Sequence, residues 1–202
     1  ILERGGVRYL IASALKSGYE YKDDWRFPGK VYVAVLPEDL SGFDEEHQLE
    51  LTVLKDNMLK NHGYYRVEDG GVQTSVISCD NGIYQFVPPA DPDSEWEIRT
   101  LTTDAASDAV MVDFDGDGVK EIAAIAPFHG EKIRFYKKVD GAYQMVYEFG
   151  EDCEFLHSIY GGTLCGKPAF VTGHRKGKRD LMAFFYNREK GSYEVEYIDH
   201  DC

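Results

Sequence analysis

The chain has 202 residues, of which 43% are hydrophobic and 13% aromatic, so it is long enough and apolar enough to fold around a core. It carries 36 acidic and 22 basic residues, and its formal net charge is −14. A surface this acidic repels phosphate backbones, so nucleic acid is not expected as a partner. No apolar run approaches the roughly 18–20 residues that would span a bilayer, and the chain is predicted to be soluble.

The cysteines and the first residue bear on the cellular compartment. The four cysteines form no CxxC pair and no dense framework: Cys79, Cys153, Cys165 and Cys202. This pattern favours free thiols and a reducing compartment such as the cytoplasm, although an even number also permits two disulfides. Because the chain starts at Ile1 and runs almost at once into an apolar strand, we expect the natural start to lie upstream. Secretion therefore stays open.

Short strand-like runs follow one another along the chain in four segments with the same internal order. They end at Gly, Asp, Asn or Pro turn signals, as strands joined by tight turns do. The runs are 9–12, 31–35 and 49–53 in the first segment; 64–67, 74–77, 83–86 and 96–99 in the second; 109–112, 122–126, 132–136 and 143–147 in the third; and 158–160, 169–172, 181–186 and 193–197 in the fourth.

The segments repeat at a regular spacing. Equivalent points at His62, Asp108, His157 and His200 recur every 43 to 49 residues. A four-stranded unit with a period of about 40–50 residues is typical of β-propeller blades, whereas a β-sandwich would not repeat the internal order of one unit. We therefore predict an all-β fold, a β-propeller of four-stranded antiparallel blades. The approximate blades are residues 1–61, 62–107, 108–156 and 157–199, with the start of another at 200–202.

The predicted propeller is incomplete. The first blade lacks its inner strand, so the chain holds about three complete blades and partial ones. Propellers usually close with about four to eight blades, and open blades leave unpaired edges. We expect a single partial propeller domain that is a fragment of a longer protein. The alternative is that a second copy of the chain supplies the remaining blades.

An acidic series marks the third segment. Asp113, Asp115 and Asp117 stand at alternate positions, and Glu121 follows. Alternate acids on a tight turn converge on one point, which suits the six to eight oxygen ligands of calcium, and the two intervening glycines permit the positive φ of such a turn. The alternative is a solvated acidic hairpin turn. The flanking runs are strands, which argues against an EF-hand.

The segment Val110–Pro127, which contains this series, resembles the FG-GAP/VCBS repeats of integrin-type and lectin-type propellers. In that family the loop joins the innermost strand to the second strand and holds calcium as a staple within the blade. The equivalent loops 68–71 and 161–166 lack the acids. The resemblance implies one calcium-binding blade. It also implies that the connections between second and third strands, and between blades, lie on the opposite face.

That topology puts five of the six histidines on the face opposite to the calcium loop. His62, His157 and His200 fall at repeat-equivalent positions near the axis, and Asp108 takes the equivalent place in the remaining blade. Imidazoles and a carboxylate suit a divalent metal such as zinc, manganese, magnesium or iron, and they can also act as acid/base groups. We predict the three histidines as catalytic residues and, together with Asp108, as metal ligands. The alternative is that they only form hydrogen bonds in turns.

The same face is expected to receive a long insertion at residues 17–29, in which aromatic residues lie among charged ones. Exposed aromatic rings flanked by carboxylates and Arg suit sugar rings. The alternative is a loop that packs its own aromatic residues as a lid. The residues predicted to bind substrate are Tyr19, Tyr21, Trp25, Arg26, His129, His174 and Arg175.

Three functions fit these features. The first is metal-assisted lyase or dehydratase chemistry on a sugar, in which the metal polarises a carbonyl and a histidine removes the neighbouring proton. The architecture is similar in outline to the propellers of aldos-2-ulose dehydratases, without a matching residue string. The second is a carbohydrate-binding module of the lectin or adhesion kind, and the third is a structural or protein-interaction propeller. We favour sugar processing, with a carbohydrate or sugar-like molecule as the partner.

Overall fold

A computed structural model describes residues 1–202, except for the side chain of Ser158. Across this described chain the secondary structure consists of 16 β-strands and no helix, so the all-β prediction is confirmed. The strands form four antiparallel sheets of four strands each. We call them sheets A to D in chain order.

Each sheet is a simple meander, because its strands lie side by side in chain order. Sheet A consists of β1 (Leu2–Arg4), β2 (Val7–Lys16), β3 (Pro28–Leu36) and β4 (Thr52–Met58). Sheet B consists of β5 (Gly63–Asp69), β6 (Val72–Cys79), β7 (Gly82–Val87) and β8 (Glu97–Thr102). Sheet C consists of β9 (Asp108–Val112), β10 (Glu121–Ala126), β11 (Lys132–Val139) and β12 (Ala142–Glu148). Sheet D consists of β13 (Leu156–Leu164), β14 (Lys167–His174), β15 (Leu181–Asn187) and β16 (Ser192–Asp199).

Sheet A contains a first strand that the sequence did not predict. β1 spans three residues and pairs with β2, with Leu2 opposite Tyr9. Leu2 is fully buried, but it is the only apolar residue of β1, so no apolar run marks the strand. The expectation that the first segment lacks its inner strand is therefore wrong. The four sheets span residues 2–58, 63–102, 108–148 and 156–199, close to the four segments expected from the sequence.

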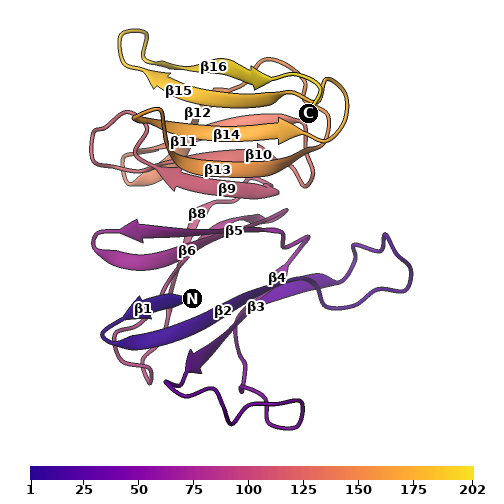
Figure 1. Ribbon diagram of the computed structural model, residues 1–202, viewed down its shortest axis with the longest axis vertical. Helices are drawn as coiled ribbons and strands as arrows, with labels where there is room; N and C mark the ends of the chain where they lie inside the picture. Colours follow the sequence, from indigo (N-terminus) through magenta and orange to yellow (C-terminus); the bar gives the residue numbers. More distant parts are fainter.

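The first strands of three sheets lie together. β9 contacts both β5 and β13. The hydroxyl of Tyr65 on β5 also donates a hydrogen bond to the carbonyl of Gly161 on β13, at 3.0 Å. Figure 1 shows sheet A at one end of the long axis, sheet B next to it, and sheets C and D overlapping in the view at the other end. The residues that precede these three strands are thereby brought close to one another.

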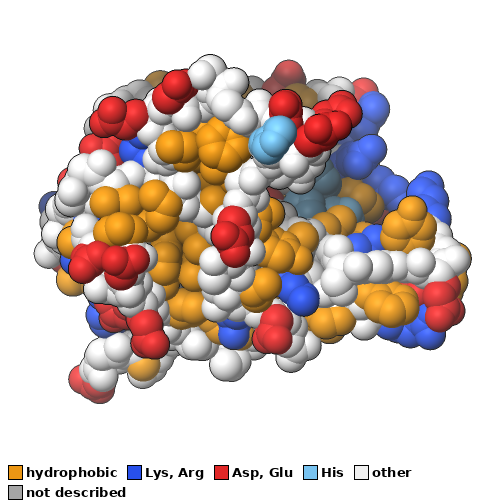
Figure 2. Space-filling view, turned by 90° about the horizontal axis from the view of Figure 1, so that it is seen from below, with side chains coloured by type: hydrophobic (Ala, Val, Ile, Leu, Met, Phe, Trp, Pro, Cys, Tyr) orange, Lys and Arg blue, Asp and Glu red, His pale blue; other side chains and the backbone are white. Residues whose placement is uncertain are grey.

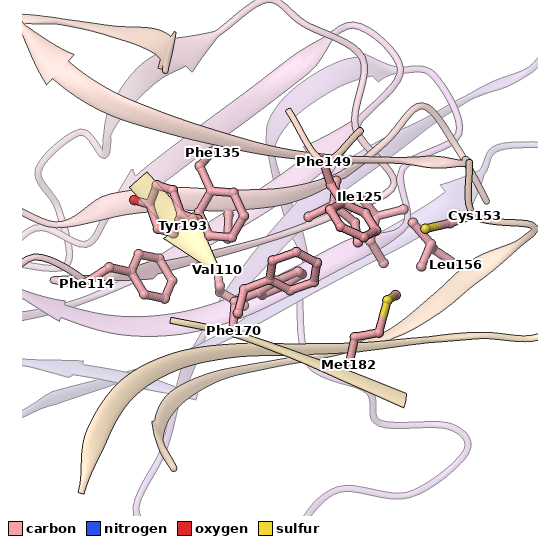
Figure 3. Close-up of a cluster of buried hydrophobic side chains, with 13 residues drawn as sticks. Val110, Phe114, Ile125, Phe135, Phe149, Cys153, Leu156, Phe170, Met182 and Tyr193 are labelled. Atoms are coloured by element: carbon pink, nitrogen blue, oxygen red, sulfur yellow. The ribbon is translucent and has the colours of Figure 1, made fainter. Parts of the chain in front are cut away.

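The largest part of the core lies between sheets C and D, where aromatic side chains meet (Figure 3). Phe135 of β11 stacks on Tyr193 of β16 with ring centroids 3.7 Å apart, and it contacts Phe170 and Phe184 at 5.8 Å. Burying one such side chain fully contributes roughly 1.5–3 kcal/mol. These contacts fix sheet D against sheet C, and with it the histidine at the start of β13.

Two sides of the molecule carry different connections. The turns between first and second strands, including residues 113–120, lie on the left in Figure 1. The connections between second and third strands, and those that lead into β5, β9 and β13, lie on the right. We call this right-hand side the histidine face. Its segments are residues 17–27, 59–62, 80–81, 103–107, 127–131, 149–155 and 175–180, together with residues 200–202 after β16.

The end of the molecule formed by sheet A exposes hydrophobic side chains among acidic ones (Figure 2). Val35, Leu51 and Val53 are 47%, 49% and 45% exposed. Apolar side chains grouped in this way usually mark a surface that another protein element covers.

Two further findings concern the cysteines and membranes. All four cysteines are free thiols, two of them buried and two exposed. Among the residues that the structure describes, no helix is long and apolar enough to cross a membrane.

Candidate functional site

Three histidine side chains from three different sheets meet on the histidine face. His62 immediately precedes β5, His129 lies in the connection between β10 and β11, and His157 is the second residue of β13. One ring nitrogen of each histidine lies within 4.8 Å of the other two. The ring centroids are 5.0 to 5.5 Å apart. We call these residues the three-histidine group.

Gly63 allows His62 to reach the group. A Cβ atom at Gly63 would lie 2.6 Å from Asp108 Oδ1 and 2.7 Å from Asp108 Cα, so β5 can start directly against β9 only because this residue has no side chain. The close approach puts Asp108 Oδ2 at 3.4 Å from His62 Nδ1, with Ser107 Oγ also at 3.4 Å. A carboxylate on one ring nitrogen orients the imidazole and leaves the other nitrogen free for a ligand. Asp108 therefore lies behind His62 rather than among the grouped nitrogens.

His129 is held between two phenylalanine rings. Its φ is 48°, and its ring stacks on Phe128 at 4.0 Å and on Phe155 at 4.6 Å. Among the described residues its Nε2 atom is buried without a hydrogen-bond partner. Burial lowers the pKa of His129 to about 4, and the neighbouring His62 and His157 add to the effect. The pKa of His157 is also lowered, chiefly by burial.

The group fits a transition metal such as zinc. Metal-binding imidazoles must be neutral, and the lowered pKa values keep His129 and His157 neutral at pH 7. A zinc ion at 2.0–2.1 Å from each nitrogen needs the nitrogens to be about 3.3 Å apart, so from separations within 4.8 Å the rings have to close by at most about 1.5 Å. Three protein ligands leave one position of a tetrahedral zinc open for water or substrate, as in catalytic zinc sites.

Aromatic side chains connect the insertion to this group. The Trp25 ring lies 5.0 Å from Phe128, which stacks on His129. The ammonium group of Lys16 lies over Trp25 at 4.7 Å. Tyr19 is 69% exposed on the same insertion. The structure thus brings Trp25 next to the three-histidine group.

Arg26, which we expected to contact substrate, is engaged within the insertion. Asp24 is fully buried and accepts hydrogen bonds from Arg26 Nε and Nη2 at 2.8 Å each, and from the Glu20 backbone at 3.0 Å. The Arg26 hydrogen bonds hold the pKa of Asp24 well below its usual range. Arg26 Nη2 also contacts Glu20 Oε2 at 2.7 Å. The guanidinium therefore shapes the insertion, and its charge is already compensated.

The predicted axial set of His62, Asp108, His157 and His200 differs from the observed group. His200 Nδ1 lies 2.6 Å from Asp180 Oδ1, and the Tyr197 ring stacks on it at 5.4 Å. His200 therefore does not join the group, because the buried Asp180 carboxylate holds it at the end of β16. His129, expected only as a substrate contact, is the third member in its place.

His174 lies beside the group in a separate environment. It is 8% exposed, and its Nδ1 accepts a hydrogen bond from the Glu154 backbone at 3.3 Å. Burial lowers its pKa. His174, His157 and Asp180 line one cavity of about 490 Å³. A larger cavity of about 740 Å³, between sheet A and residues 92–98, has neither a histidine nor a basic residue in its lining.

The acidic series forms a compact loop, which we call the acidic loop (residues 113–121). Oxygens of Asp113, Asp115 and Asp117 lie within 4.8 Å of one another, and the two intervening glycines have φ of 69° and 89°. Glu121 is 1% exposed and accepts a hydrogen bond from the Phe114 backbone at 2.8 Å. Its Oε1 and Asp113 Oδ1 are buried without partners among the described residues. Burial raises the pKa of Glu121 to about 7.

Lys137 of β11 reaches into the acidic loop. Its ammonium group contacts Asp115, lies 2.8 Å from Asp117 Oδ2 and lies 3.8 Å from Glu121 Oε1. The two aspartates raise the pKa of Lys137 by hydrogen bonding. The sequence pattern did not predict this contact, because Lys137 lies 16 residues beyond the end of the loop.

Sequence reasoning also missed the two rings that hold His129. Phe128 directly precedes His129, and Phe155 precedes His157 by two residues. This pairing of an aromatic residue with a histidine in two successive segments was a usable signal. Stacking of these rings was not readable from the sequence, because it depends on the positive φ of His129 and Phe155, 48° and 57°.

No family model matches this sequence, and no curated protein matches it at a significant level. The class of protein that the observations define is therefore an all-β chain of four antiparallel meanders with a three-histidine group and an acidic loop.

Proposed function

We propose that the four sheets are blades of a β-propeller of the FG-GAP/VCBS kind. The same strand order in all four sheets and the contacts of β9 with β5 and β13 support this reading. The exposed apolar side chains at the sheet A end favour further blades packed there, from a longer chain or from a second copy. A crystal structure tests the arrangement. Blades around a common axis are expected, and a linear stack of sheets would contradict it.

We also propose that the acidic loop binds calcium as a staple between β9 and β10. The two buried carboxylate oxygens without hydrogen-bond partners support a cation there, because leaving such atoms without a hydrogen bond costs free energy. Calcium accepts several carboxylate oxygens at 2.3–2.6 Å. A rise in melting temperature on adding calcium, absent in Asp115→Asn, is the expected result.

For the function, we propose metal-assisted lyase or dehydratase chemistry on a sugar or sugar-derived substrate. The observation that carries it is the convergence of three imidazoles from three sheets, one of them with a buried nitrogen that lacks a partner. A metal bound there supplies Lewis-acid polarisation of a substrate carbonyl or hydroxyl. Aromatic rings at Trp25 and Phe128 next to the group suit the apolar face of a sugar.

With two of the predicted catalytic histidines in the metal group, His200 is the residue for proton transfer. The Asp180 carboxylate holds Nδ1 of His200, as an orienting carboxylate does in catalytic triads. The Nε2 atom of His200 is then left to accept a proton. Asp180 and His157 line the same cavity. In a dehydration, His200 would take the proton from the carbon next to the carbonyl and deliver it to the hydroxyl on the next carbon, which would leave as water. No oxidant or reductant is required.

Metal analysis of the purified protein tests this function. One transition-metal ion per chain is expected, lost in His62→Ala, His129→Ala and His157→Ala. His47→Ala is the matched control, because His47 is exposed and paired with Asp44, away from the group. Retention of the metal in all three variants would contradict a metal site at the three-histidine group.

A non-catalytic carbohydrate-binding module is the second candidate. It is favoured by the exposure of Tyr19 and Tyr21, 69% and 59%, which are free to stack on a sugar. A binding module would hold sugars equally well after chelation of the transition metal, and His200→Ala would not change binding or consume substrate. If the protein removes water from the sugar, and the variant His200→Ala does not, the protein is an enzyme rather than a binding module.

A further inference from the structure

Arg175 is a positively charged side chain one aromatic ring away from the three-histidine group. It follows the last residue of β14, and its backbone N–H donates to the Phe155 carbonyl at 2.9 Å. Its guanidinium lies over the Phe155 ring at 5.5 Å, and the other neighbour of that ring is His129 at 4.6 Å. Its charge also acts on the imidazoles, since it lowers the pKa of both His129 and His157.

Among the described side chains, Arg175 has no acidic partner within 4.0 Å, although the chain has 36 acidic residues. Two other cations of the same connection are compensated, whereas Lys176, among the described side chains, also lacks an acidic partner within 4.0 Å and lies over the Phe155 ring at 5.6 Å. Lys178 pairs with Glu151 at 2.9 Å, and Arg179 pairs with Asp201. Arg and Lys side chains also gather on this side of the molecule in Figure 2. An anion next to Arg175 would therefore meet a charge that the protein leaves available.

The cavity of about 490 Å³ lies beside this charge. Its lining includes Arg175, Arg179, His157 and His174, and the carboxylate that it contains, Asp180, is already engaged by His200. Small-molecule sites commonly have volumes of about 300–1,000 Å³ and a few convergent polar groups. His157 belongs to both the cavity and the three-histidine group, so one small ligand can contact both.

We propose that this site takes a sugar acid. Its carboxylate would pair with the Arg175 guanidinium, and its hydroxyl or carbonyl oxygens would face the three-histidine group. The second half of this contact rests on the proposed function, because it needs a metal at that group. A guanidinium offers two parallel N–H donors that match the two oxygens of one carboxylate.

Calorimetric titration of the zinc-loaded full chain with D-glucuronate, D-glucose and glucose 6-phosphate tests this inference. D-glucuronate is expected to bind more than tenfold more tightly than D-glucose. The variant Arg175→Gln is expected to lose roughly ten- to a hundredfold in affinity for glucuronate and to keep its affinity for glucose, since one charged hydrogen-bonded pair is removed. Arg175 is exposed, so the substitution leaves the core intact.

The matched control is Lys178→Gln, which removes a compensated cation of the same connection and should leave glucuronate affinity unchanged. If zinc binds but glucuronate binds no better than glucose, or Arg175→Gln has no effect, the inference is wrong and the metal site stands. If zinc fails to bind while glucuronate binding still depends on Arg175, the proposed function fails and the carboxylate contact stands. Tighter binding of glucose 6-phosphate would assign the site to phosphate instead and overturn the proposal.

Discussion

The ammonium nitrogen of Lys137 lies 2.8 Å from the Oδ2 atom of Asp117, inside the acidic loop that joins β9 to β10. Lys137 comes from the neighbouring strand β11, and it also contacts Asp115. A single positive charge thereby sits among carboxylates that are placed to bind a divalent cation. Calcium and Lys137 would share the same oxygens, so the affinity of the loop for calcium should depend on this lysine.

Lys137→Met is therefore expected to raise calcium affinity, because the competing cation is removed. The same change should destabilise the calcium-free protein by about 1 kcal/mol, since Asp115 and Asp117 lose a charged partner that solvent already screens in part. Calorimetric calcium titration and thermal unfolding with and without a chelator measure both effects. Lys138→Met is the matched control, as Lys138 lies next in β11 and has an exposed side chain. Unchanged calcium affinity in Lys137→Met would show that lysine and calcium do not compete.

Glu121 makes the calcium-free loop sensitive to pH. Its pKa is raised from 4.5 to about 7 by burial and by the neighbouring Asp115 charge. Between these values the folded state holds a proton that the unfolded state has released, so stability falls as pH rises through this window, by on the order of 2–3 kcal/mol. Calcium needs the ionised carboxylate, and its affinity should fall as pH drops below about 7.

Chemical unfolding of the chelated protein between pH 4.5 and pH 7 tests the Glu121 prediction. In Glu121→Gln the side chain keeps its size but no longer titrates, so the slope should flatten and calcium affinity should drop at every pH. The same slope in both proteins would assign the pH dependence to another group.

The titration of His129 changes folding stability with pH in the opposite direction to that of Glu121. Its pKa is lowered from 6.5 to about 4, chiefly by burial. Between these values the unfolded state binds a proton that the folded state does not, so stability is lost as pH falls from 6.5 towards 4, by on the order of 2–3 kcal/mol. Unfolding of metal-free protein across this range is the measurement. His129→Gln should show a shallower acid slope, and His47→Gln should match the unchanged chain.

The all-β class and the strands of three sheets could be predicted from the sequence because strands and turns are local features. Short apolar runs that end at Gly, Asn or Asp correspond to the strands of sheets B, C and D. β1 was not predicted, because a strand of three residues with one apolar side chain has no periodicity to detect. How the sheets pack against one another depends on contacts such as Tyr65 to Gly161, 96 residues apart, which no local pattern encodes.

The candidate site could be predicted from the sequence only in part, because it also depends on contacts between residues distant in sequence. Repeat spacing correctly brought His62 and His157 to the same place. It failed for His200, because the Asp180 carboxylate binds its ring at the end of β16. The entry of His129 into the group depends on a backbone φ of 48° and on two flanking rings. Conformations of this kind are set by tertiary packing.

The close approach at Gly63 links the fold to the site most directly. In Gly63→Ala the new Cβ would lie 2.6–2.8 Å from atoms of Asp108 and Ser107, closer than carbon atoms can approach backbone atoms. The start of β5 must then move away from β9, which costs about 1–3 kcal/mol as in other overpacked sites. Because His62 is the preceding residue, its ring moves away from the other two. Zinc affinity should fall more than tenfold, measured by competition with a chelating dye.

Gly42→Ala is the matched control, since a Cβ there meets no atom within 4 Å, and it should leave stability and zinc binding unchanged. Full zinc affinity in Gly63→Ala would mean that the position of His62 does not depend on this contact.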